Sequence, residues 1–278
     1  MKKKIGLTLL FVCSLSVATA QTAADSSAIV TADWRTVHLQ KDVLYRKATF
    51  DTLYGVPQEV FIIELPQKHR RWDVQIHAPR EETSVAARRS GAVAAINGSY
   101  FDMKEGHSVC YLRKNGVVVD TTAHDNILAT IANGALFIRH GKLKLTPWNK
   151  QKERDCRLKR GAVVLASGPL MLLDGKVCDF SACNPGFVNT KHPRSAVVLT
   201  TDKKILLIVV DGRRKGVAEG ISIPHFAHLI RVLGGKDALN LDGGGSSTLW
   251  SVSLPGHGVA NTPSGKTERK VANSLCVY

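Results

Sequence analysis

Residues 239–248 read LNLDGGGSST, an apolar strand that runs into one carboxylate, three glycines and three hydroxyl groups. No hydrophobic core requires that order of residues. Three successive glycines permit unusual backbone angles and remove side-chain bulk, so backbone N–H groups can approach a ligand oxygen. The segment therefore predicts Asp242 at a strand end and an anion-holding turn made by Gly243, Gly244, Gly245, Ser246 and Ser247. A tight surface turn without a ligand is the alternative, and it leaves Asp242 unexplained.

Apolar runs and alternations on both sides of this segment indicate a strand-rich chain. They predict strands at residues 59–65, 72–78, 92–96, 127–131, 162–166, 196–200, 205–210 and 272–277. The pairs Asn115-Gly116 and Asp174-Gly175 are hairpin signals that favour antiparallel pairing. Apolar spacing predicts a helix over residues 222–233 and a weaker one over 81–89. We expect an α+β fold of strand-rich mixed sheets with a few flanking helices.

The first residues have the features of an export signal. Lysines at positions 2–4 precede an apolar run over residues 5–12, and small residues end at Ala20. This pattern predicts an exported protein, periplasmic or extracellular. A lipoprotein anchor on Cys13 is the less favoured alternative, because Val12 is large for the position before such a cysteine.

The remaining chain is long enough for one large domain. We expect residues 1–20 to be a signal peptide, residues 21–35 a flexible leader because they are small and polar, and residues 36–278 one large domain. After Gln21 no apolar run reaches the roughly 18 residues that cross a bilayer, so no transmembrane segment is expected there.

The chain is strongly basic, with a formal net charge of +15. Such a charge attracts anionic partners, although a solvated basic surface is an equally good interpretation. No lysine-arginine stripe alternates with aromatic residues, and export argues against an intracellular nucleic-acid role. We therefore expect an anionic partner and no nucleic acid.

A basic cluster precedes the predicted strand at 196–200. Residues 191–196 read KHPRSA, and the planar fork of Arg194 suits two oxygens of a phosphate or carboxylate. His192 is a weaker candidate for substrate binding, because a histidine before proline can simply end a turn.

A second carboxylate, Asp211, follows the apolar strand at 205–210. If its strand is a neighbour of the strand before Asp242, the two aspartates form the pair that glycosidic cleavage generally uses. One is then the general acid and the other the nucleophile or base. Alternatively, both bind a divalent cation such as calcium, which prefers oxygen ligands.

Residues 97–102, NGSYFD, follow the predicted strand at 92–96 and suit sugar recognition. The ring of Tyr100 offers an apolar face to a pyranose, while the amide of Asn97 can bond sugar hydroxyls. The alternative is a core tyrosine with a turn before it.

These four segments together resemble the phosphodiester glycosidase family in order and spacing, over roughly residues 90–278. The resemblance implies that residues 36–278 form a catalytic domain that hydrolyses a sugar 1-phosphodiester, such as one of N-acetylglucosamine, at the anomeric carbon. The partner that it implies is an anionic glycan or sugar phosphodiester. The site residues that it implies are Asn97, Arg194, Asp211, Asp242, Gly243, Gly244 and Ser246.

Two other functions stay open at this point. A binding protein of the same fold for phosphorylated or acidic surface glycans needs Arg194 and the glycine turn, but not both aspartates. A metal-dependent phosphodiesterase attacks phosphorus instead of carbon and uses Asp211 and Asp242 as metal ligands.

Overall fold

The computed structural model describes residues 23–123, 126–156, 161–265 and 267–278. The expected signal peptide and Cys13 lie outside these residues. No helix within them is long and apolar enough to span a membrane.

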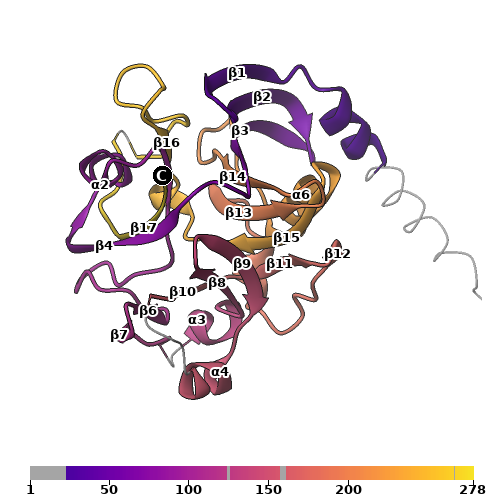
Figure 1. Cartoon of the computed structure of the whole chain (residues 1–278). Helices are drawn as coiled ribbons and strands as arrows, with labels where there is room; N and C mark the ends of the chain where they lie inside the picture. Colours follow the sequence, from indigo (N-terminus) through magenta and orange to yellow (C-terminus); the bar gives the residue numbers. More distant parts are fainter. Residues whose placement is uncertain (1–22, 124–125, 157–160, 266) are drawn as a thin grey trace, which may run out of the picture.

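Three sheets make up the fold (Figure 1). The largest sheet has the strand order β1 (Arg35–Gln40), β2 (Val43–Leu53), β3 (Val56–Pro66), β14 (Lys204–Val210), β13 (Arg194–Thr200), β15 (Gly235–Asn240), β11 (Leu170–Leu173), β12 (Lys176–Val177). The second has the order β7 (Val117–Asp120), β6 (Leu112–Lys114), β10 (Val163–Ser167), β8 (Gly134–Arg139), β9 (Lys142–Pro147). The third has the order β16 (Leu249–Ser251), β5 (Ala94–Asn97), β17 (Val271–Val277), β4 (Trp72–Glu81).

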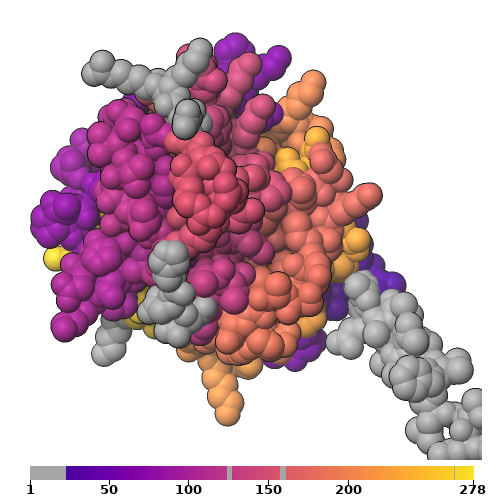
Figure 2. Space-filling model, turned by 90° about the horizontal axis from the view of Figure 1, so that it is seen from below, coloured from indigo at the N-terminus to yellow at the C-terminus, as the bar shows by residue number. Residues whose placement is uncertain are grey.

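Short helices flank these sheets. They are residues 23–31, α2 (Thr83–Ser90), α3 (Asn126–Ile131), α4 (Lys150–Asp155), α5 (Pro185–Asn189), α6 (Ile223–Val232) and the 3₁₀ turn η1 (Gly244–Ser246). Figure 2 shows the magenta-to-pink residues of the second sheet, α3 and α4 covering much of the lower face of the molecule.

The largest sheet has a hydrophobic core on each face. One core joins strands of all three sheets, with Val209, Ile96 and Leu136 as members. The opposite core holds Val210 and is covered by apolar residues of α6 and of the helix at residues 23–31. Alternate residues of one strand thus serve two cores, as the twofold side-chain period of a strand requires. Strands of all three sheets thus contribute to one shared core.

The α+β fold with few helices is confirmed, and so are both hairpins at Asn115-Gly116 and Asp174-Gly175. The described strand pairs run antiparallel, so the sheets are antiparallel rather than mixed. Antiparallel neighbours do not need the long crossover connections that parallel strands require.

Two local predictions are wrong. The strand predicted at residues 127–131 is the helix α3, because a short apolar run does not by itself distinguish a strand from a buried helix. The leader predicted to be flexible is helical over residues 23–31. Its Ile29 is 1% exposed, and its Asp25 accepts a hydrogen bond from the backbone N–H of Tyr54.

Candidate active site

The candidate site lies at one edge of the largest sheet. Strand β13 begins there with Arg194, which pairs with Val210 of β14, while Ala196 pairs with Asn240 of β15. Both flanking strands run antiparallel to β13, so they end where β13 begins. Asp211 and Asp242 therefore emerge at the same edge, as the sequence predicted, but β13 lies between their strands.

The two aspartates do not form a pair. Arg194 and Val210 share one face of the sheet, and Asp211 is one residue further along, which directs it to the other face. Its bonds are to Asn261 and Thr262, whereas the charge of Asp242 acts on Arg194 and Tyr100. The acid-and-nucleophile pair expected from the sequence is therefore not assembled.

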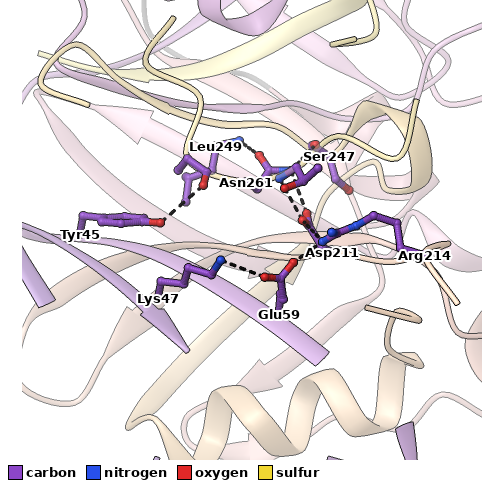
Figure 3. A network of polar contacts seen from close by, with 10 residues as sticks. Tyr45, Lys47, Glu59, Asp211, Arg214, Ser247, Leu249 and Asn261 are labelled. Carbon is purple, nitrogen blue, oxygen red and sulfur yellow. Dashed lines mark hydrogen bonds and ion pairs between the residues drawn. The ribbon is translucent and has the colours of Figure 1, made fainter. Parts of the chain in front are cut away.

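Asp211 belongs to a closed network of polar contacts (Figure 3). Its side chain is 1% exposed, and Oδ1 accepts a hydrogen bond from Asn261 Nδ2 at 3.0 Å. Oδ2 accepts from the backbone N–H of Thr262 at 2.9 Å and from Arg214 Nη2 at 3.0 Å.

The network extends outward through Arg214 to Glu59, which also pairs with Lys47 at 2.9 Å (Figure 3). Burial raises the pKa of Asp211 to about 6, against the opposing effect of its three donors. Because both oxygens are already used, this carboxylate holds the loop of Asn261 to the sheet.

Asp242 has a more open environment, because its residue is only partly buried. Its Oδ1 accepts a hydrogen bond from the N–H of Gly243 at 2.9 Å. Burial raises its pKa to about 6, while Ser246, Arg269 and Arg194 act in the opposite direction. The carboxyl group is thus mainly ionised at neutral pH and lies among cations.

The glycine turn differs from the expected N–H cradle. Gly244 N donates to Pro193 O at 2.8 Å, Ser246 N to Gly243 O at 3.2 Å and Ser247 N to Gly244 O at 3.3 Å. With the N–H of Gly243 bonded to Asp242, most of these donors are used within the chain. They are not available to hold a phosphate, contrary to the sequence interpretation.

The glycines instead make room for neighbours. A methyl group on Gly243 would lie 2.6 Å from Pro193 O, and one on Gly244, whose φ is +61°, would lie 2.9 Å from Arg213 Nη2. A methyl group on Gly245 would overlap the guanidinium of Arg269. The missing side chains allow two guanidinium groups to approach the turn closely.

Arg213 and Arg269 are the site residues that the sequence interpretation missed. Arg213 is exposed and Arg269 partly buried; Arg269 Nη1 donates to Ser246 Oγ at 3.4 Å. Both lie in segments that carry motifs, but only the folded chain brings residue 269 beside residue 245. A single sequence contains no signal for that proximity.

Arg194 is a fixed, buried cation. It is 2% exposed, with Nη2 donating to Phe187 O at 2.7 Å and to Thr190 O at 3.1 Å, and its guanidinium stacks on the ring of Phe187 at 4.5 Å. Burial lowers its pKa to about 10, which still leaves it charged at neutral pH. Within the described residues Arg194, Arg213 and Arg269 make no ion pair.

Tyr100 and His192 are partly buried near these groups. The hydroxyl of Tyr100 donates to Gly168 O at 2.5 Å and accepts from Asn240 Nδ2 at 2.9 Å, and burial raises its pKa well above the usual value. Burial lowers the pKa of His192, and the charges of Arg194 and Arg213 lower it further. His192 is therefore neutral at pH 7.

The buried side chain of Asn97 links neighbouring segments of the site and does not face a ligand. It is 0% exposed; its Nδ2 donates to Asp242 O at 2.7 Å, and its Oδ1 accepts from Ser195 Oγ at 2.8 Å and Thr248 N at 3.2 Å. The predicted sugar contact of Asn97 is therefore wrong. Ser246 and Ser247 are also buried, and Ser247 Oγ has no partner among the described residues.

The divalent cation that Asp211 and Asp242 were expected to share does not fit their geometry, because these carboxylates face opposite sides of the sheet. Within the described residues no group of three or more His, Cys, Asp or Glu side chains converges on a point that could hold a metal ion.

The fold and the site define a class of protein: an α+β domain of antiparallel sheets whose partly accessible carboxylate lies among unpaired arginines. Comparison with known families agrees with this description. The chain belongs to the phosphodiester glycosidase family, whose profile matches residues 90–278.

Two solved structures share the fold. The catalytic domain of zebrafish N-acetylglucosamine-1-phosphodiester alpha-N-acetylglucosaminidase, auto-inhibited by pro-peptide, is similar with a TM-score of 0.66 and 18% identity, over 89% of this chain and 88% of that one. A hypothetical protein from Synechocystis has a TM-score of 0.62 and 13% identity, over 88% and 63% of the two chains.

A sequence relative is the uncharacterized SPbeta prophage-derived protein YomE of Bacillus subtilis (strain 168). It is 28% identical over 207 residues, which cover 71% of this chain and 30% of the relative. The chain thus spans less than a third of that protein's length.

Proposed function

We propose that this protein is an exported hydrolase that cleaves a sugar 1-phosphodiester at the anomeric carbon, with Asp242 as the reacting carboxylate. One observation carries the proposal: a partly accessible Asp242 lies beside three arginines that have no carboxylate partner within the described residues. Unpaired cations around a carboxylate suit a ligand that brings its own negative charge.

In this proposal the arginines hold the phosphodiester. Arg194 is the fixed cation, because its hydrogen bonds to backbone carbonyls set its position. Arg213 and Arg269 approach from the exposed side of the glycine turn. Their planar donors match phosphate oxygens, and they stabilise the negative charge that grows on the departing phosphate.

The bond that breaks joins the anomeric carbon to the phosphate oxygen, which leaves with the electron pair. A phosphate is a good leaving group and needs little protonation, so one carboxylate suffices. Asp242 attacks the anomeric carbon or removes a proton from the attacking water. In both cases an oxygen atom from water ends on the sugar. In this proposal Tyr100 contacts the sugar, and neutral His192 hydrogen-bonds the substrate.

The test uses the chain without residues 1–20, incubated in ¹⁸O-labelled water with UDP-N-acetylglucosamine and a panel of sugar 1-phosphodiesters. Release of reducing sugar that contains the label supports attack at carbon. Label in the phosphate product would instead show attack at phosphorus. EDTA is added in parallel, and activity that survives it agrees with a site that uses no metal.

A failure to cleave any substrate is informative if circular dichroism shows that the protein is folded. Binding of the intact phosphodiesters, measured by calorimetry, would then favour a glycan-binding protein of this fold. Export is tested separately, by locating the full chain in periplasm, medium or cytoplasm after expression with and without residues 1–20.

A further inference from the structure

A second charged region lies at the opposite end of the largest sheet. In the antiparallel pair of β3 and β14, Val60 pairs with Val210 next to the candidate active site, and Pro66 pairs with Lys204 at the far end. The chain leaves β3 there and turns at residues 67–71 into β4. Seven residues of β14 separate the two ends, about 20 Å at strand spacing.

This turn and the β8–β9 hairpin turn line a cleft of about 930 Å³. Gly141 of the hairpin approaches the backbone of Arg70, so the two turns are in close contact. The volume is at the upper end of the range for small-ligand pockets. The lining residues are Gln67, Lys68, His69, Arg70, Arg71, His140, Gly141, Lys142 and Tyr278.

The lining is cationic and has no acidic side chain. Its basic side chains are Lys68, Arg70, Arg71 and Lys142, and none of them forms an ion pair within the described part of the chain. Exposed lysines elsewhere do form ion pairs. Lys204, for example, pairs with Glu64 at 2.6 Å. Four other clefts in the described residues are each lined by at least one Asp or Glu. Four positive charges thus lie together in this cleft without an acidic side chain to balance them.

We propose that this cleft binds an acidic polysaccharide, one that carries phosphate, sulfate or uronate groups, at a site separate from Asp242. Repeated anions on a flexible sugar chain match four unpaired cations in one groove. This second site would keep the protein on an anionic glycan independently of the chemistry at the other end of the sheet.

Two other polyanions fit the cleft less well. Nucleic acids usually stack bases on free aromatic faces, and the Tyr278 ring is already covered by the guanidinium of Arg71 at 3.7 Å. Anionic membranes bind protruding basic and apolar residues, whereas these cations line a concavity and no exposed large apolar residue is among them.

The experiment measures binding of fluorescein-labelled heparin and polygalacturonate to the chain without residues 1–20, with neutral dextran as the uncharged control. The cleft variant combines Lys68→Gln, Arg71→Gln and Lys142→Gln. The matched variant combines Lys104→Gln, Arg154→Gln and Lys176→Gln, which removes the same charge from exposed positions outside the cleft.

We expect the cleft variant to weaken binding at least about tenfold near physiological salt and to flatten its salt dependence, because three phosphate- or sulfate-like contacts are lost. The matched variant should change the affinity less than about twofold, and both variants should keep the parent melting temperature. Equal weakening by the two variants, absence of binding by the parent, or tighter binding to single-stranded DNA or to phosphatidylglycerol vesicles would overturn the proposal.

Discussion

Asp211 and Asp242 stand at matching places in the fold but in opposite chemical situations. Each follows an apolar strand, each precedes a glycine, and burial raises the pKa of each to about 6. Asp211 accepts three hydrogen bonds from protein groups, one of them from Arg214. Asp242 is partly accessible, and the arginines around it have no carboxylate partner within the described residues.

The difference shows that a carboxylate's role depends on whether its oxygens and its cations are already paired. Around Asp211 the chain supplies donors, and a further acid, Glu59, pairs with Arg214. Around Asp242 the cations exceed the acids, and the anionic substrate that we propose would balance this local charge. The following predictions test this contrast, from the largest expected effect to the smallest.

The variant Asp242→Asn should lose about 10²- to 10⁴-fold in kcat, because it removes the reacting carboxylate but keeps the shape of the side chain. Its melting temperature should stay at or above that of the parent, since a partly buried charge is removed. Steady-state kinetics on the substrate of the labelling experiment and a thermal melt give both values. Full turnover by this variant would remove Asp242 from the mechanism.

The variant Asp211→Ala should show the reverse pattern. Three donors lose their acceptor, so the free energy of unfolding should fall by about 2–4 kcal/mol. The activity per folded molecule should change by less than about threefold, because Asp211 is placed outside the chemistry. Urea denaturation and active-site titration are the measurements. A loss of kcat as large as that of Asp242→Asn would mean that the two aspartates act together after all.

The pH profile should reflect Asp242 and not Asp211. Since the ionised carboxylate is the reacting form in the proposed mechanism, kcat/KM should fall about tenfold per pH unit below the pKa of about 6. Asp211→Ala should leave this acid limb of the pH profile unchanged. A shift of the limb in that variant would mean that Asp211, and not Asp242, sets it.

Stability should change with pH in the opposite sense to activity. The folded-state pKa of Asp242 is raised above its unfolded value of about 3.9, so the folded state binds this proton more tightly. The parent should therefore gain stability relative to Asp242→Asn as the pH falls from about 7 to 4, and lose that gain as the pH rises through the folded-state pKa. Urea denaturation of the parent and of Asp242→Asn at several pH values measures this difference in stability.

The variants Arg213→Gln and Arg269→Gln should have the smallest effects. Each removes one of the proposed, partly solvated phosphate contacts, so KM should rise about threefold to tenfold with little change in melting temperature. Arg154→Gln, on the exposed surface of α4, is the control and should leave KM unchanged. Unchanged KM in both site variants would leave Arg194 as the anion-binding residue.

Sequence patterns were sufficient for the strands that carry the site. Continuous apolar runs marked β13 and β14, and the spacing from Phe226 to Leu233 marked α6. They also placed Asp211 and Asp242 at strand ends. The edge hairpin β8–β9 and the strand β16 were missed, because short alternating segments with many lysines or serines give a weak signal.

The details of the site could not be read in the same way. Which face an aspartate occupies depends on register, and a shift of one residue reverses it. Whether Asn97 meets solvent depends on the packing of β5 against β13 and the glycine turn. The approach of Arg269 to Gly245 joins segments separated by the loop after β16, and a single sequence has no record of that contact.

The chain order of the site elements also bears on how the protein is made. Strands β13, β14 and β15 follow one another in the chain, with a turn after β13 and a loop and α6 after β14. Arg194, Asp211 and Asp242 therefore come together through contacts of comparatively short sequence separation. Arg269 lies just before β17, which pairs with β4 and β5 across most of the chain. Such distant pairings carry the largest loop-closure cost and form late. A nascent chain that ends before Arg269 therefore contains the carboxylate but lacks one of its cations, so the site is completed only after Arg269 has been added and β17 has paired.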